Sequence, residues 1–451
     1  MQVIVVGAGK VGTAICRDLS REEHEVTLIE RNEAKLNAVV DQYQIMGISG
    51  NGAFYDVQME AGVPSCDLFI AVTPQDEINI MACVVAKKLG AKYTIARVRM
   101  PEYASHVGFV QENLGISRMI NPELEAAQEI YRMIRYPSAL SVVPFAYNKI
   151  NLVELAITEE SQLKGLNLIK IRKEYNHLLV CILVRDEKTI IPRGDTVLKE
   201  GDRLFITGAP SDLGALYRSM GTVDKIRSVM IIGGGRICRY LLEMLRGMKF
   251  DIKVIESDEE TANSLAEDFQ DVSVIYGDGT DQSLLDNQHI TGYDCVITLT
   301  GIDEENIILS MFAAMRKVPR RITKINRNNL IKMLSGMGLQ SAITPPNIVA
   351  TNVLRLIRGI SNSEGSLVEA LYRVDNSSAE VLQFKVTEQS RAVGKPIRLL
   401  PIKKGIIIAA LITDGKVKIP SGADAIYPGD QVLIATVEGE LYDLDDILEE
   451  A

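Results

Sequence analysis

Two glycine-rich turns carry the residues of this chain that are best suited to hold a phosphate. Each turn follows a short apolar run and precedes an amphipathic one, so that a strand leads through glycines into a helix. Backbone N–H groups at the start of such a helix point at a bound pyrophosphate. Gly7 allows the tight bend, Gly9 the close approach of the phosphate and Gly12 the contact of helix with strand. The residues of the first turn are Gly7, Ala8, Gly9, Lys10, Val11 and Gly12.

The second turn begins 226 residues after the first and departs from the G-x-G-x-x-G fingerprint at one position. Cys238 stands where the first turn has its third glycine, which adds a side chain where helix and strand should touch. We therefore expect the second helix to lie further from its strand, and the first turn to make the better nucleotide site. The residues predicted to line the second site are Gly233, Gly235, Arg236 and Ile237.

A cation occupies the same place just inside each turn, Lys10 in the first copy and Arg236 in the second. A pyrophosphate needs no cation there, because the helix N–H groups suffice. The pair either indicates a more heavily charged ligand, such as ATP or ADP, or consists of exposed residues in the first helical turn. The sequence leaves both alternatives open.

An acidic residue at the end of the second strand completes each site. Glu30 follows the first turn by about 20 residues, where a carboxylate accepts hydrogen bonds from the ribose hydroxyls of a dinucleotide. The same carboxylate would repel a 2′-phosphate, which favours NAD(H) or an adenosine nucleotide over NADP. Arg31 could pair with such a phosphate, although we interpret it as a solvated residue at the entry of a helix. Glu256 is the counterpart of Glu30.

Polar residues close the predicted clefts at two further places. Thr73 and Thr300 end the fourth strand of each copy, at the lip where open α/β sheets bind ligands. Another group follows the third strand, near the expected position of the adenine. Its members are Asn51, Gly52, Asp278 and Gly279.

Two acid–amide pairs follow the threonines. Asp76 and Asn79 are interpreted first as helix N-cap residues, with cofactor contact as the alternative. The same interpretation applies to Asp303 and Asn306 in the second copy.

Two arginines and a glutamate are further candidates. Arg97 and Arg99 alternate at the end of the fifth strand, so both side chains face one side, toward phosphates, a neighbouring subunit or solvent. Glu123 opens the helix after the sixth strand, where a carboxylate suits the helix dipole, and we favour that interpretation over a subunit or cation contact. The second copy has Pro345 and Pro346 at this place.

The elements that position these residues repeat between the halves of the chain. Apolar, β-branched strands alternate with amphipathic helices, which predicts a parallel sheet covered on both faces. The predicted strands of the first copy are residues 3–6, 26–30, 45–49, 68–73, 93–97 and 118–120.

After Pro137 the alternation changes to short strands separated by Gly-Asp and Pro-Arg-Gly turns, and the same change recurs in the second half. The fold class is therefore α/β, with two tandem Rossmann-like doubly wound domains, each followed by a small α+β lobe. The expected nucleotide-binding domains are residues 1–137 and 227–360, and the expected lobes are residues 138–220 and 366–451.

Composition excludes several classes of protein. The net charge of −10 opposes direct binding to nucleic acid or to anionic lipid. The longest apolar stretch, residues 406–412, is far shorter than a membrane span, so we expect no direct membrane insertion, and the first strand leaves no room for a signal peptide. The six cysteines form no C-x-x-C pair and are interpreted as reduced thiols of a cytosolic protein without a metal site.

The order of four modules resembles the regulatory subunits of Trk-type potassium uptake (TrkA type), which consist of two tandem regulator-of-potassium-conductance (RCK) units. The resemblance covers essentially the whole chain. It implies a homotetrameric ring that is peripheral on the cytoplasmic face of the cell membrane. The partner that it implies is a membrane potassium-translocating subunit of the TrkH type.

Three functions are compatible with nucleotide clefts. A switch would use NAD(H) or ATP/ADP occupancy to select between domain arrangements and so gate its partner, with no catalytic residues. An NAD-dependent oxidoreductase would need a proton-transfer group, but the four histidines do not repeat between the halves. A redox-sensing repressor would need a basic recognition element, which the sequence lacks. The sequence favours the switch.

Overall fold

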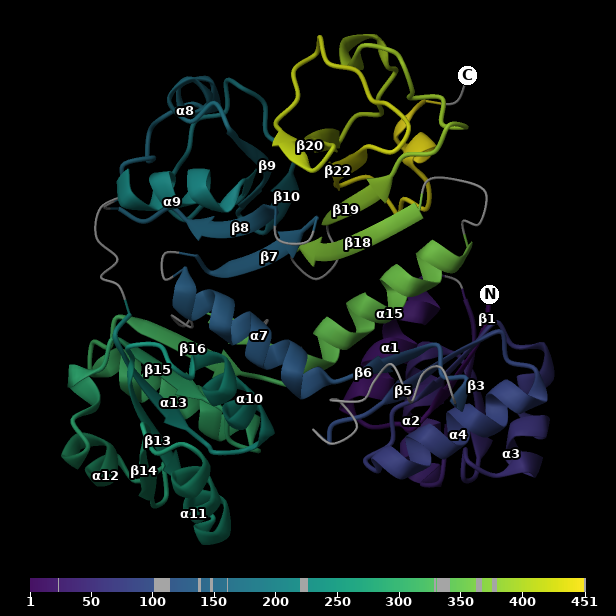
Figure 1. Ribbon diagram of the computed structural model, residues 1–451, viewed down its shortest axis with the longest axis vertical. Coiled ribbons are helices and arrows are strands. Elements are labelled where there is room, and N and C mark those ends of the chain that lie inside the picture. The colour runs from purple at the N-terminus through teal and green to yellow at the C-terminus, as the bar shows by residue number, and fades with distance from the viewer. Residues whose placement is uncertain are drawn as a thin grey trace. The chain divides into compact units, whose positions relative to one another are not determined.

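Figure 1 shows the computed structural model, which describes residues 1–22, 24–100, 114–136, 139–146, 149–159, 161–219, 226–327, 330, 341–361, 367–374 and 379–449. Its contacts group the chain into two compact units. One unit combines Met1–Tyr131 with Arg227–Leu354, and the other combines Arg132–Ile226 with Arg355–Ala451. Like modules of the two halves therefore pack together, although each Rossmann-like module is followed along the chain by its own lobe.

The first sheet is parallel, with strand order β3-β2-β1-β4-β5-β6, which confirms the doubly wound fold class. Its central strand β1 is buried because both faces are covered by helices, and Val3, Ile4, Val5 and Val6 are at most 3% exposed. The strands are β1 Gln2–Val6, β2 Glu25–Glu30, β3 Met46–Ser49, β4 Leu68–Ala71, β5 Tyr93–Arg97 and β6 Arg118–Ile120. The helices are α1 Lys10–Arg21, α2 Glu33–Tyr43, α3 Tyr55–Glu60, α4 Asp76–Leu89 and α7 Pro122–Arg135.

Side chains of β1 alternate between the two faces of this sheet. Ile4 and Val6 pack in one cluster with Ala82 and Cys83 of α4. α1 and α2 contact each other and lie against β1, β2 and β3. The glycine turn between β1 and α1 therefore opens beside β4, where the strand order reverses and open sheets bind ligands.

The second sheet repeats this topology in the order β14-β13-β12-β15-β16-β17, also parallel. Its strands are β12 Ser228–Ile232, β13 Asp251–Glu256, β14 Ser273–Tyr276, β15 Cys295–Thr298, β16 Arg320–Lys324 and β17 Ser341–Ile343. Its helices are α10 Arg236–Leu245, α11 Glu259–Asp268, α12 Gln282–Asn287, α13 Asp303–Met315 and α15 Pro345–Ser361.

Hydrogen bonds between the repeats cross from each copy to the other within this unit. The Arg17 guanidinium on α1 donates to Asn347 Oδ1 on α15 (3.1 Å). In the opposite sense, the Tyr240 hydroxyl on α10 donates to the carbonyl of Arg99 (2.8 Å) and accepts from Asn121 Nδ2 (2.9 Å). The first helix of each copy thus lies beside the last strand and helix of the other copy.

The two lobes are five-stranded antiparallel sheets with the same strand order, β10-β9-β11-β8-β7 and β21-β20-β22-β19-β18. The first contains β7 Ser141–Phe145, β8 Ile150–Ala156, β9 Leu178–Arg185, β10 Lys188–Ile190, β11 Arg203–Gly208, α8 Leu168–Glu174 and α9 Pro210–Ser219. The second contains β18 Leu367–Val374, β19 Ala379–Lys385, β20 Ile406–Thr413, β21 Lys416–Lys418 and β22 Gln431–Thr436, with 3₁₀ turns Ile397–Leu399 and Leu444–Ile447 where the first lobe has α8 and α9.

One hydrophobic core joins the two lobes. It includes Phe145, Ile182 and Phe205 of the first lobe with Val381 and Leu433 of the second, all at most 2% exposed. No described helix of either unit is both long and apolar enough to cross a bilayer.

Candidate nucleotide-binding site

The first predicted cleft is present at the carboxyl edge of the first sheet. It is a cavity of about 370 Å³ between the glycine turn, the end of β2 and the residues after β4. The structure brings together most of the residues predicted for this site. Those that line the cavity are Gly7, Gly9, Glu30, Arg31, Asn51, Gly52 and Thr73.

Glu30 is held in place by two backbone groups. Its Oε2 accepts from the N–H of Ala8 (2.7 Å) and its Oε1 from the N–H of Asn32 (2.9 Å). Each carboxylate oxygen has a second lone pair, so the same group can still accept from a vicinal diol. The N–H of Ala8, which the sequence assigned to the phosphate site, is used by Glu30.

The second cleft has the same design and a volume of about 410 Å³. Glu256 accepts from the N–H of Gly234 (2.5 Å) and of Asp258 (2.8 Å), as Glu30 does in the first copy. Its predicted residues also lie together: Gly233, Gly235, Glu256, Asp278, Gly279 and Thr300 line the cavity.

Charge distinguishes the two clefts. Asp278 accepts from the N–H and hydroxyl of Thr280, and these hydrogen bonds lower the pKa of the carboxyl below its usual value. It lines the second cleft, together with Glu256 and Glu305. The first cleft has neutral Asn51 at the position of Asp278 and includes Arg31 and Lys35 in its lining. The electrostatics of the first cleft are therefore the more favourable for a phosphate ligand.

The three glycines of the first turn have different geometries. Gly7 has φ +106°, a left-handed conformation that favours glycine. A Cβ on Gly12 would lie 1.9 Å from the carbonyl oxygen of Gly7, whereas a Cβ on Gly9 would meet nothing within 4 Å. At the position equivalent to Gly12, Cys238 carries a fully buried side chain. The wider helix-to-strand spacing expected for the second turn stays a prediction.

The N-cap interpretation of Asn79 and Asp76 is wrong. Asn79 is fully buried, and its Oδ1 accepts from the N–H (2.8 Å) and hydroxyl (2.7 Å) of Thr73. Its Nδ2 donates to the carbonyls of Thr73 (3.0 Å) and Arg97 (2.9 Å). The residue before α4, Gln75, makes no side-chain cap. Asn79 instead joins the ends of two neighbouring strands, because both strand ends leave backbone groups without a partner in the sheet.

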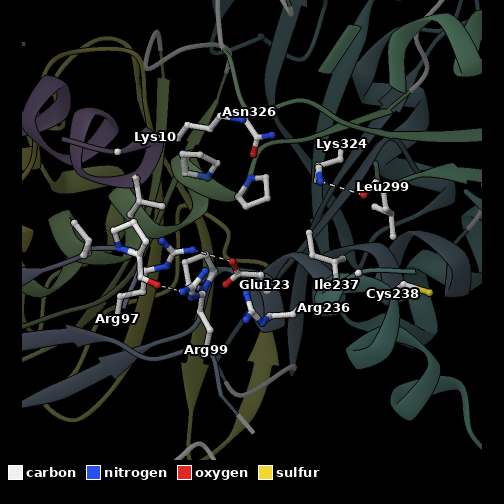
Figure 2. Close-up of a pocket in the computed structure, with 18 residues that line it drawn as sticks. Lys10, Arg97, Arg99, Glu123, Arg236, Ile237, Cys238, Leu299, Lys324 and Asn326 are labelled. Carbon is white, nitrogen blue, oxygen red and sulfur yellow. Dashed lines mark hydrogen bonds and ion pairs between the residues drawn. The ribbon is translucent and has the colours of Figure 1, made fainter. Parts of the chain in front are cut away.

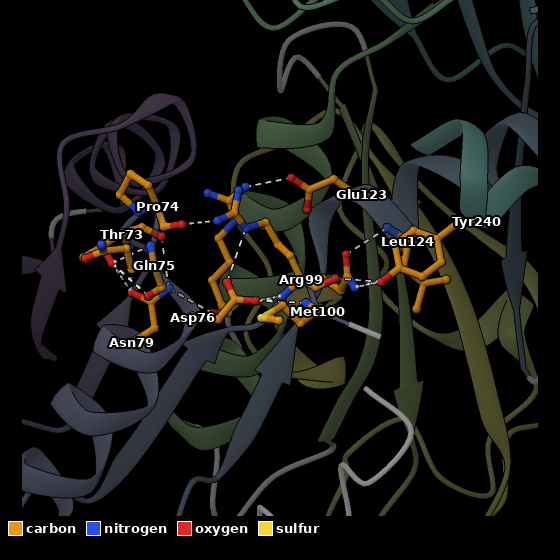
Figure 3. Close-up of polar contacts among 12 residues, drawn as sticks. Thr73, Pro74, Gln75, Asp76, Asn79, Arg99, Met100, Glu123, Leu124 and Tyr240 are labelled. Carbon is orange, nitrogen blue, oxygen red and sulfur yellow. Dashed lines mark hydrogen bonds and ion pairs between the residues drawn. The ribbon is translucent and has the colours of Figure 1, made fainter. Parts of the chain in front are cut away.

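Asp76 performs a similar task one step further along the chain. Its carboxylate accepts from the N–H groups of Arg99 (2.7 Å) and Met100 (2.9 Å) and pairs with the Arg99 guanidinium (3.3 Å), as Figure 3 shows. In the second copy, Asn306 bonds Thr300 and the carbonyl of Lys324 in the same way. These contacts fix the loops that follow β5 and β16.

A third cavity, which the sequence did not predict, lies between the two sheets of this unit (Figure 2). Its volume is about 440 Å³, and we call it the central cavity. Glycines of both turns, Gly9 and Gly235, line it as well as their own clefts. Five predicted site residues line the central cavity and do not line the clefts. They are Lys10, Val11, Arg97, Arg236 and Ile237.

The central cavity is rich in cations, since Arg99 and Lys324 line it in addition to Lys10, Arg97 and Arg236. Lys10 and Arg236 are exposed. The regular spacing of the repeat could have revealed Lys324, which follows Arg97 by 227 residues. What the linear sequence could not show is that both glycine turns face one space.

Arg97 and Arg99 are paired, and their side chains are 14% and 17% exposed, so of the three alternatives left open for them the solvent-facing one is wrong. Arg97 donates to Glu123 Oε1 (2.8 Å), and the two side chains are 14% and 18% exposed. Glu123 therefore does more than complement a helix dipole. Within the described residues, Arg97 Nε and Glu123 Oε2 are buried and have no hydrogen-bond partner.

Lys324 occupies the place of Arg97 in the second copy without a matching carboxylate. Its Nζ donates to the carbonyl of Leu299 (3.1 Å), and position 346 is proline where the first copy has Glu123. Burial lowers the pKa of Lys324 to about 8, and the charge of Lys10 contributes in the same direction.

The described linings of the three cavities include one side chain whose pKa lies near neutrality, Lys324 of the central cavity. None of the described residues that line them is a histidine. Cys238 lines the central cavity, but burial raises the pKa of its thiol to about 12, so it is protonated at neutral pH.

Comparison with known families matches both kinds of module, twice each. The TrkA-N domain matches residues 3–122 and 229–345, and the TrkA-C domain matches residues 152–221 and 381–449.

Curated relatives match over nearly the whole length. The chain is 31% identical over 443 residues to the Trk system potassium uptake protein TrkA homolog 2 of Methanosarcina mazei, with 96% of this chain and 97% of that protein covered. It is 30% identical over 440 residues to the Trk system potassium uptake protein TrkA of Haemophilus influenzae, with 96% and 95% covered.

Solved structures share the fold. The GsuK RCK domain gives a TM-score of 0.64 at 19% identity, covering 97% of this chain and 92% of that one. The GsuK channel bound to NAD gives a TM-score of 0.64 at 18% identity, with 97% and 77% covered. Together, the duplicated clefts, the paired domain matches and the full-length relatives show that the chain belongs to the TrkA family of Trk-system potassium uptake proteins.

Proposed function

We propose that this protein is a nucleotide-sensing regulatory subunit, in which NAD(H) or ATP/ADP in the two clefts controls a membrane potassium-translocating subunit of the TrkH type. The observation that carries the proposal is the joint architecture of the clefts. Each has a glycine turn and a preorganised carboxylate, and both open onto one cationic cavity through Gly9 and Gly235.

This architecture suits a switch because a phosphate group that enters the central cavity meets side chains of both sheets. Lys10 and Arg97 come from the first copy, and Arg236 and Lys324 from the second. A ligand in either cleft then favours the distance between the two sheets at which these cations best contact its phosphate. To invert a balance of 1:99, ligands must discriminate between the two arrangements by roughly 5.5 kcal/mol in total.

Binding rather than catalysis is the function we assign to the clefts. Hydride transfer to a substrate requires an acid–base group beside the nicotinamide. The clefts offer carboxylates that hold backbone N–H groups, and Lys324, whose pKa is about 8, lines the central cavity and neither cleft. The alternative function is that of an NAD-dependent oxidoreductase, and the flux assay below distinguishes it from a regulatory subunit.

The family supports the partner and the location that we propose. Relatives are named as Trk system potassium uptake proteins, and a GsuK channel with the same fold is bound to NAD. With a net charge of −10, the protein would be held at the cytoplasmic face of the membrane by its partner rather than by anionic lipid. We propose a homotetramer, whose paired units form the ring implied by the duplicated RCK architecture.

The proposal is tested at Glu30, whose carboxylate would bind the ribose diol. The variant Glu30→Gln should weaken NADH and ATP binding at the first cleft by about 10- to 100-fold in calorimetry, the effect of losing one charged hydrogen bond. Glu33→Gln is the matched control, because Glu33 is an exposed acid in the first turn of α2 that does not line the cleft. Thermal unfolding of both variants checks that the turn is intact.

Potassium flux in proteoliposomes containing the transport subunit then tests the switch. Addition of this protein should make flux depend on the nucleotide present, and Glu30→Gln should shift that dependence to higher concentration. Unchanged affinities for both ligands would contradict the site assignment. Consumption of NADH with a small substrate, with flux unaffected, would favour the oxidoreductase.

A further inference from the structure

The central cavity has one cationic side chain whose surroundings are poorly matched to its charge. Lys324 lies at the end of β16, and its Nζ donates to the backbone carbonyl of Leu299 (3.1 Å). Within the described residues, no carboxylate lies within ion-pair distance of it. Its equivalent Arg97 has such a partner in Glu123.

This difference has a local cause in the sequence. The helix that enters the cavity from the first copy begins Pro122-Glu123, and its counterpart begins Pro345-Pro346. Proline cannot supply a carboxylate, so within the part of the chain that the structure describes this lysine has no ion-pair partner. The two halves of one cavity therefore differ in charge although their backbones repeat.

The rest of the lining does not compensate for this lysine. The charged groups that face it belong to several elements, and most are cations. They are Lys10 of α1, Arg97 at the end of β5, Arg99 after it, Glu123 of α7, Arg236 of α10 and Asp303 of α13. Glu123 is paired with Arg97, and Asp303 with Arg327 and the backbone N–H of Asn326.

We propose that the central cavity binds a phosphate-type anion and that Lys324 takes up a proton when this anion enters. Lys324 and Arg236 hold the anion from the second copy, at the start of α10, and Lys10 from the first. The anion is either free inorganic pyrophosphate or the terminal phosphate of a nucleotide in one of the clefts. The second of these sources rests on the proposed function.

The coupling follows from the two states of the lysine. Without an anion, burial and the charge of Lys10 lower the pKa of Lys324 to about 8, so about half of the molecules lack this proton at pH 8. An anion beside Nζ favours the charged form and raises that pKa. The contribution of Lys324 to the affinity for the anion should therefore be constant below pH 8 and should fall as pH rises above it, by at most tenfold per pH unit.

Calorimetry in two buffers with different ionisation enthalpies measures the protons taken up per anion bound. With inorganic pyrophosphate or ADP at pH 8, the wild type should take up as much as about 0.5 proton. Lys324→Arg keeps a charge that does not titrate, so it should bind the anion within about threefold of the wild type with no uptake. Lys88→Arg is the matched control on the exposed side of α4 and should retain the full uptake.

A second measurement on the wild-type protein does not depend on a variant that folds. NMR of dimethylated lysines follows the titration of each amine, and the Lys324 signal is the one missing from Lys324→Arg. Its midpoint should lie near pH 8 in the free protein and rise by about one pH unit or more with pyrophosphate.

Three results would overturn the proposal. One is a Lys324 midpoint near 10.5 that pyrophosphate and ADP leave unchanged, another is the same proton uptake in Lys324→Arg as in the wild type, and the third is no binding of either anion. Uptake with ADP but not with pyrophosphate would support it and identify the nucleotide as the source. Because these assays use the purified protein alone, absence of flux control would leave their outcome intact and would count only against the proposed function.

Discussion

Gly9 and Gly12 are three residues apart in the same turn, yet alanine should affect them in opposite ways. A Cβ on Gly12 would lie 1.9 Å from the carbonyl oxygen of Gly7, where real Cβ atoms come no closer than 3.0 Å. Helix α1 must then move away from β1 by about 1 Å. A Cβ on Gly9 meets nothing within 4 Å, and its φ of −75° is open to any residue.

The expected magnitudes differ accordingly. Overpacking against a backbone oxygen costs about 3 kcal/mol, and the better helix propensity of alanine offsets about 1 kcal/mol, so Gly12→Ala should lose about 2 kcal/mol of unfolding free energy. For a unit of this size that loss lowers Tm by about 4–8 °C. Gly9→Ala should leave Tm within about 1 °C, because the lower backbone entropy of the unfolded state offsets the weaker N-cap.

The effect on ligand binding should be the reverse, because Gly9→Ala lowers affinity without lowering stability. The methyl group of Gly9→Ala projects where the pyrophosphate would approach, so NADH affinity at the first cleft should fall by at least about tenfold in a protein of wild-type stability. Differential scanning calorimetry and NADH titration on both variants measure the two effects. If Gly12→Ala unfolds like the wild type, or Gly9→Ala unfolds as early as Gly12→Ala, the assignment of packing to one glycine and ligand approach to the other is refuted.

Two further variants test buried charges. Arg358 is fully buried and pairs with Glu380 (2.6 Å) beneath the ring of Tyr442, so Arg358→Met should lose about 3–5 kcal/mol in urea unfolding, and a loss below about 1 kcal/mol would contradict a buried ion pair. Lys324→Met should instead gain about 3 kcal/mol at pH 7, because it removes a cation whose pKa falls from 10.5 to about 8 on folding. That gain should shrink as pH rises from 8 to 10.5, where the unfolded wild type still binds the proton and the folded one does not; a gain independent of pH would show that packing, not charge, is responsible.

Local chemistry explains why most of the cleft could be predicted. The bend at Gly7, the contact at Gly12 and the acid at Glu30 are each required by their position relative to one strand and one helix. Their repetition after 226 residues made the second cleft equally visible. The polar pairs were harder, because Asn79 is placed like an N-cap in sequence, and only the neighbouring strand end shows that its amide bonds Arg97.

The sequence alone determined the fold class and the duplication and predicted most residues that line each cleft, since these depend on periodicity and on spacing within single βαβ units. Only the tertiary structure showed that Lys10 and Arg97 share a cavity with Arg236 and Lys324, and that Glu123 neutralises the first half and not the second. The physical reason is that the sheets pack with each other rather than with their own lobes. Which charges of the two copies meet is then decided by contacts between residues more than 100 positions apart.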